Sequence, residues 1–129
     1  TEVNESSSNI VAYCWADVEG FQKFGSYTGN GSSDGPFVYL GFRPRLLVLK
    51  RTTSSGFFNV FDSARKTFNS NSNSYLVWNN TDQEANGVPI DFLSNGFKVR
   101  SSGSGVNSSG NLMIYMAWGD QSAKYSNAF

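Results

Sequence analysis

The sequence contains no histidine, one cysteine and three prolines among its 129 residues. Without histidine, the chain has no Ser-His-Asp or Cys-His catalytic machinery and no histidine-based zinc site. One cysteine excludes an internal disulfide, and the alternation of Cys14 with Ala12 and Ala16 predicts a small buried side chain rather than a reactive thiol. These absences exclude most common hydrolase mechanisms.

The chain also lacks an excess of charge and any long apolar run. Ten basic and ten acidic residues cancel, so the field that attracts nucleic acid or an acidic membrane is missing. No stretch approaches the roughly 18 apolar residues of a membrane helix, and the first residues have no basic segment typical of a signal peptide. We therefore expect a soluble chain with no nucleic-acid partner and no membrane insertion.

The composition favours short strands. Aromatic residues make up 16%, Ser, Asn and Gly fill the gaps, and no convincing helical period appears. The densest apolar run, GPFVYLGFRPRLLVLKR over residues 35–51, predicts two strands buried on both faces and joined by a turn. Pro44 cannot donate to a ladder, so it belongs in that connection or at the first residue of the second strand.

The rest of the chain predicts strands that cover this pair. They fall at residues 10–18, 57–62, 75–78, 90–93, 97–100 and 111–118, with Asn95-Gly96 as a two-residue hairpin turn. Residues 66–74 are expected to form an exposed loop, and residues 101–110 a flexible connection. The prediction is an all-β domain of eight or nine strands in two packed antiparallel sheets.

The two ends of the chain resemble each other. Residues 3–17 (VNESSSNIVAYCWAD) align without a gap to residues 106–120 (VNSSGNLMIYMAWGD), and Lys124-Tyr125-Ser126 then falls opposite Lys23-Phe24-Gly25. We infer a tandem repeat of about a hundred residues. Residues 1–129 then form one domain, in which 20–129 are one full repeat and 1–18 are the closing strand of an upstream repeat, which either caps this domain or completes its sheet. The alternative is convergence of two edge strands in one sandwich.

Several of these segments together resemble a known family. They are VAYCWADVEGFQKFGSYTGNGSSDGPFVYLGFRPRLLVLKR, IDFLSNGFKVR, IYMAWGD and KYSNA. The chain is similar to a domain of unknown function in marine bacteriophage proteins described as tail-fibre or SPRY/lectin-like. The resemblance implies a jelly-roll, concanavalin-like sandwich in a virion appendage, made in the host cytoplasm. It also implies that the domain is repeated along a longer polypeptide and that three such chains form a trimer. It implies no catalytic or ligand residues.

Sugar recognition is the sharpest functional hypothesis, because a sugar binds an exposed aromatic face flanked by amides and carboxylates. Two sets of residues meet that description: Tyr27, Asn30 and Asp34 in one loop, and Trp78, Asn79, Asn80 and Asp82 at the end of a strand. The alternative for each set is an aromatic at a sheet edge beside an ordinary polar turn.

No cofactor and no catalytic residue are expected. Calcium could bind at Asp34 or at Asp82 and Glu84, but neither segment matches a defined calcium loop. We expect a non-enzymatic module that contacts a host cell-surface glycan or a neighbouring virion protein. A structural spacer that binds nothing external is the second hypothesis, and a glycan depolymerase with two carboxylates is the third.

Overall fold

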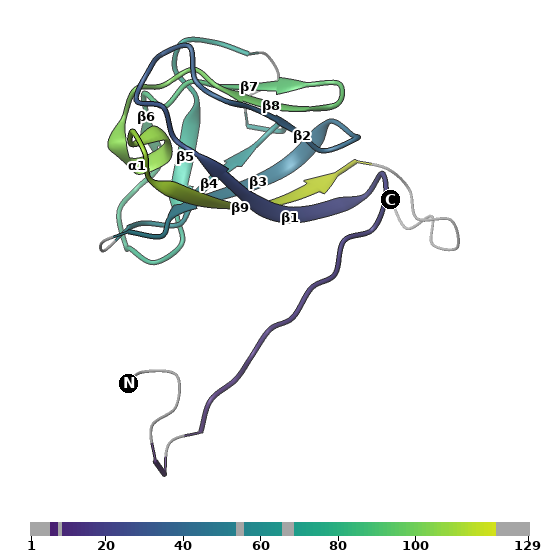
Figure 1. Cartoon of the computed structure of the whole chain (residues 1–129). Coiled ribbons are helices and arrows are strands. Elements are labelled where there is room, and N and C mark those ends of the chain that lie inside the picture. The colour runs from purple at the N-terminus through teal and green to yellow at the C-terminus, as the bar shows by residue number, and fades with distance from the viewer. Residues whose placement is uncertain (1–5, 8, 54–55, 66–68, 121–129) are drawn as a thin grey trace.

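The computed structural model describes residues 6–7, 9–53, 56–65 and 69–120. Within these residues the chain forms nine strands and one helical turn (Figure 1). The strands are β1 (Gln22–Thr28), β2 (Phe37–Tyr39), β3 (Pro44–Arg51), β4 (Asn59–Asp62), β5 (Ser74–Val77), β6 (Ala85–Asn86), β7 (Ile90–Leu93), β8 (Gly96–Val99) and β9 (Leu112–Gly119). The helical turn, α1 (Ser104–Asn107), lies between β8 and β9. None of the helices in these residues is long and apolar enough to cross a membrane.

The strands form two antiparallel sheets. The larger sheet has the order β1-β9-β3-β4-β5-β6, and the smaller has the order β2-β8-β7. Neither sheet closes into a barrel, and the smaller one lies across the larger one (Figure 1). The predicted all-β sandwich and its strand number are confirmed.

Strand β9 lies second from one edge of the larger sheet, between β1 and β3. It pairs with β1 from Gln22↔Trp118 to Thr28↔Leu112, and with β3 on its other side. Because side chains alternate along a strand, Met113, Tyr115 and Ala117 enter the core while the residues between them face outward. The core is completed by side chains of both sheets, namely Leu47, Leu49, Phe61, Ile90, Phe92, Phe97 and Val99.

The apolar run at residues 35–51 spans both layers. Strand β3 is covered on both faces, as predicted, and Leu47, Val48 and Leu49 are all buried. Strand β2 instead belongs to the smaller sheet, and Phe37 and Tyr39 are exposed beside the buried Val38. The prediction of two strands covered on both faces is therefore wrong for β2, because the break at residues 40–43 takes the chain from one sheet to the other.

The N-terminal arm, residues 9–17, departs most from expectation. It is extended but belongs to no strand, and it leaves the body at the start of β1 (Figure 1). Cys14, predicted to be buried, is exposed. The place between β1 and β3 is filled by β9.

Asparagine side chains complete the open edge of β7. Asn73 exchanges two hydrogen bonds with the backbone of Ile90, and Asn69 does the same with Phe92, at lengths of 2.7–3.2 Å. Asn73 is buried, although residues 66–74 were predicted to be an exposed loop. Its amide takes the place of a neighbouring strand, which composition alone did not reveal.

Two further local predictions need correction. Leu93 pairs with Gly96, so the two-residue turn of the predicted hairpin is Ser94-Asn95, one residue earlier than expected. Residues 101–110 are not a loose connection, because α1 buries Val106 and Asn107 there. The turn that follows β4 is held by Asp62, whose carboxylate accepts from the backbone N–H groups of Ala64 and Arg65.

Candidate functional site

The first predicted set contains an aromatic residue that the fold covers. Tyr27 is only 8% exposed, and its ring packs edge-on against Phe97. Its hydroxyl donates to the backbone oxygen of Val106 at 2.5 Å, and burial raises the pKa of Tyr27 well above its ordinary value. Tyr27 was predicted to stack on a sugar, but its place in the register of β1 turns it into the core.

Asn30 in the same set is engaged by its own loop. Its side-chain oxygen accepts from the backbone of Ser32 and from the amide of Asn107, and its side-chain nitrogen donates to the backbone oxygen of Asp34. These bonds leave Asn30 holding the shape of residues 28–35. We find it in a structural role.

Asn107 is the hub of this loop, and sequence reasoning missed it. Its side chain is fully buried, accepts from the backbone N–H of Asn30 at 2.8 Å, and donates to Asn30 Oδ1 and to the backbone oxygens of Ser32 and Ser101 at 2.8–2.9 Å. Because these partners lie 6 to 77 residues away in sequence, no local motif marks the position.

Asp34 lies at the surface near the end of this loop. Its carboxylate pairs with the Lys98 ammonium at 2.6 Å, and the hydrogen bond and charge of Lys98 lower the pKa of Asp34. It lines a shallow hollow with Ser33, Asn71, Pro89 and Arg100. The fold therefore separates Asp34 from the aromatic partner predicted for it.

The second predicted set remains accessible. Trp78, directly after β5, is 56% exposed, and Asn79, Asn80 and Asp82 follow it at the surface. Among the described residues, the Trp78 indole has no stacked ring and no side-chain hydrogen bond. One face and one N–H donor are free to receive a ligand.

The turn after Trp78 is fixed by its amides. Asn79 accepts from the backbone N–H of Phe58 at 3.0 Å, which ties the turn to β4. Asn80 donates to the Asp82 carboxylate and accepts from the backbone of Thr81. Asn79 thus positions the turn, and Asn80 and Asp82 are exposed in the segment that follows it.

Trp78 borders a mainly apolar hollow of about 460 Å³ on the outer face of the larger sheet. We call it the Trp78 hollow, and its lining residues are Tyr13, Trp15, Phe58, Trp78, Asn79 and Met116. Lys50 covers one face of the Phe58 ring, with its ammonium 4.2 Å from the ring centre. Phe58 and Met116 were not among the predicted residues, although their positions alternate with core residues in the register of the sheet.

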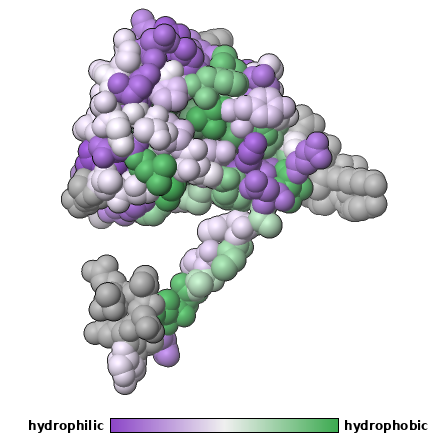
Figure 2. Space-filling view, viewed as in Figure 1, coloured by the Kyte–Doolittle hydropathy of each residue, from purple (hydrophilic) through white to green (hydrophobic). Residues whose placement is uncertain are grey.

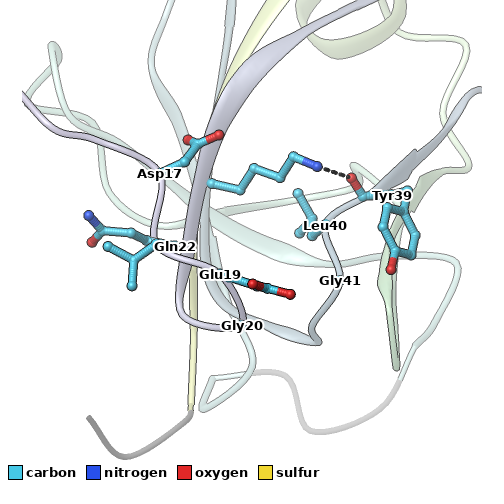
Figure 3. A pocket seen from close by; sticks show the side chains of 9 residues that line it. Asp17, Glu19, Gly20, Gln22, Tyr39, Leu40 and Gly41 are labelled. Atoms are coloured by element: carbon cyan, nitrogen blue, oxygen red, sulfur yellow. Dashed lines mark hydrogen bonds between the residues drawn. The ribbon is translucent and has the colours of Figure 1, made fainter. Parts of the chain in front are cut away.

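A second hollow, of about 550 Å³, lies where the arm turns into β1 (Figure 3). Asp17, Glu19, Lys23 and Tyr39 line it, and the Lys23 ammonium donates to the backbone oxygen of Tyr39 at 3.3 Å, the hydrogen bond drawn as a dashed line in Figure 3. The Lys23 ammonium also lies 5.5 Å from the centre of the Tyr39 ring. That cation covers part of the aromatic surface that a sugar would need, so Tyr39 is the poorer platform.

Within the part of the chain that the structure describes, no three acidic or cysteine side chains gather as metal ligands. Asp34 pairs with Lys98, and Glu84 pairs with Arg65 at 3.1 Å. The two candidate calcium segments are thus already engaged with cationic side chains.

A family model matches residues 1–122, which include the arm as well as both sheets. Its description is "Domain of unknown function (DUF7483)". The chain belongs to this family. No curated protein and no solved structure matches the chain. Membership in DUF7483 assigns no activity, so the function has to be argued from the site.

Proposed function

We propose that this DUF7483 domain is a non-enzymatic module that binds carbohydrate at the Trp78 hollow. The observation that carries the proposal is the exposed indole of Trp78, which lines an aromatic hollow and lies directly before a polar turn. A pyranose has one apolar face and a rim of hydroxyls. The indole supports the apolar face, and Asn80 and Asp82 receive the hydroxyls.

The ion pairs of the chain favour binding over catalysis. Asp34, Asp62, Glu84, Asp91 and Asp120 each pair with an arginine or lysine. Hydrolysis of a glycosidic bond needs two carboxylates on either side of the bond, one of them with a raised pKa. The lowered pKa of Asp34 and of Asp62 makes these two carboxylates poor proton donors.

The source of the sugar is proposed from the family resemblance. A domain similar to phage tail-fibre modules would meet glycans on the host cell surface, with the domain itself in the virion. Several copies in one appendage would compensate for a weak single site, because avidity raises binding by roughly 10² to 10⁴.

A glycan array probed with the multivalently displayed domain tests the proposal. We expect one glycan class to bind, and Trp78→Ala to weaken that binding by at least about tenfold. Trp78 is more than half exposed, so the variant should keep its melting temperature. Tyr39→Ala is the matched control, because it removes an exposed aromatic from the other sheet and should leave binding intact. Absence of binding by a folded domain, or equal loss in both variants, would refute the proposal.

A structural role is the second candidate, and the exposed arm favours it. Ile10, Val11, Tyr13 and Trp15 are 50–76% exposed, which is costly for apolar side chains in water. Figure 2 shows apolar surface along this arm, outside the packed body. Such a segment is suited to contact a neighbouring domain in a fibre.

A further inference from the structure

We propose that the arm is the ninth strand of a preceding domain with this same fold, where it fills the place between that domain's β1 and β3. The proposal does not depend on carbohydrate binding. It joins three observations: the sequence of the arm, its exposed apolar side chains, and the short turn that connects it to β1.

The identities between the two ends of the chain fall at positions with structural roles. Residues 3–17 match residues 106–120 at five of fifteen positions, with a constant offset of 103. Four of the five matched residues have defined contacts in this domain. Val106 and Asn107 are buried in α1, Trp118 packs on Phe24, and Asp120 pairs with Arg45 at 2.8 Å. Chance similarity in Ser/Asn-rich sequence would not select them.

The side chains of the arm follow the alternation of β9. Offset by 103, Ile10, Ala12 and Cys14 correspond to Met113, Tyr115 and Ala117, which all face the core. Ala117 is fully buried, so Cys14 fits the requirement for a small side chain there. In this structure the corresponding arm residues have no such core around them. The arm therefore has the residue alternation of a strand that is paired on both sides, but in this structure it belongs to no sheet.

The outward residues of the arm already touch this domain. Trp15 stacks on Phe24 with ring centres 6.2 Å apart and meets Trp118 edge-on at 6.5 Å. A strand inserted in a preceding sheet through Ile10 and Cys14 would keep its other face free for these contacts. One strand could thus serve both domains at once.

The connection from arm to β1 is short and ordered. Val18 bridges to Gln22, Gly20 has a φ of +74°, and the Asp17 carboxylate accepts from the backbone N–H of Phe24 at 2.9 Å. Successive repeats would then be joined directly, with the last strand of one leading through a tight turn into the first strand of the next.

Exchange of arms between two separate copies of this chain would not give the arm a place in a sheet. In each copy β9 already occupies the position between β1 and β3. The partner has to be a copy that lacks its own ninth strand, which is the arrangement in a tandem repeat.

A tandem chain tests this directly. Residues 1–111 are joined to residues 9–129, so that the second copy's arm replaces residues 112–120 of the first. With Cys14→Ser in the first copy, the thiol left in the tandem chain is Cys14 of the inserted arm. We expect a maleimide to modify it at least about 100-fold more slowly than in the single chain, where Cys14 is exposed.

The matched control moves the thiol by three positions. In a second tandem chain the inserted arm carries Val11→Cys and Cys14→Ser. Its cysteine corresponds to Ile114, which is 37% exposed, so it should react nearly as fast as in the single chain. Slow reaction at position 14 with fast reaction at position 11 supports the insertion. Equal protection at both positions contradicts the register of β9.

A further variant of the tandem chain controls for the loss of core packing where a smaller side chain replaces Tyr115. Ala12 would replace Tyr115, whose ring fills the space above Gly25, so Ala12→Tyr restores the original contact. If Cys14 reacts at the single-chain rate in both the Ala12 and the Tyr version of the tandem, the arm is not a ninth strand and the proposal is overturned.

Discussion

Removing the buried amide of Asn107 should destabilise the domain strongly. The side chain is fully buried, accepts one hydrogen bond, and shares its two N–H hydrogens among three oxygen acceptors. A hydrogen bond contributes about 1 kcal/mol net, and an orphaned buried partner costs more. Because water can reach part of the 28–35 loop, we expect Asn107→Ala to lower the free energy of unfolding by about 3–4 kcal/mol.

Urea denaturation followed by tryptophan fluorescence measures this loss. With a slope of about 2 kcal/mol per molar urea, the midpoint should fall by about 1.5–2 M. Asn107→Asp should be at least as damaging at pH 7, because a carboxylate would face three oxygen atoms that now receive its N–H groups.

Asn111 provides the matched control four residues away. Its side chain donates one hydrogen bond, to Ser108 Oγ, and is only half-buried. We expect Asn111→Ala to cost about 1 kcal/mol or less. If Asn107→Ala costs no more than Asn111→Ala, the hub does not hold the loop and the reasoning is refuted.

Two further predictions concern the backbone and acid stability. A Cβ on Gly96 would lie 2.1 Å from the backbone oxygen of Val38, so Gly96→Ala should cost about 2–3 kcal/mol, whereas Gly105→Ala meets its nearest atom at 3.8 Å and should be neutral or stabilising in thermal denaturation. Equal melting temperatures would contradict this. Burial raises the pKa of Asp62, but hydrogen bonds and the charge of Arg65 outweigh it and lower the pKa overall. The stability that a lowered native pKa contributes is fully present above the unfolded pKa of about 3.9. This contribution is lost as the pH falls through the native pKa. The wild type should therefore lose more stability than Asp62→Asn in urea titrations from pH 5 to 2, and parallel curves would argue against the linkage.

The sequence predicted what depends on neighbours along the chain. The apolar run around Leu47 predicted β3. Exposure of Trp78 also followed from its place between an apolar strand and a polar turn. Each of these features is decided by residues a few positions apart.

Features that depend on distant segments were not predictable in this way. Alternation in the arm predicted a buried Cys14 in a strand, but the side chain is exposed and the arm pairs with no strand. Tyr27 was assigned to a loop, and only its pairing opposite Met113 shows that its ring enters the core. In the sequence, nothing distinguishes Asn107 from other polar residues. Its role is apparent only when the fold places residues 30–32 and Ser101 around its side chain.

The paired asparagines beside β7 have a consequence for crowding. An open strand edge is a template on which another chain can add a strand, and this is a common route to aggregation. Here Asn69 and Asn73 already bind the backbone groups of Phe92 and Ile90 that would receive an incoming strand. Many copies can therefore be held at high local concentration without lateral polymerisation through this edge.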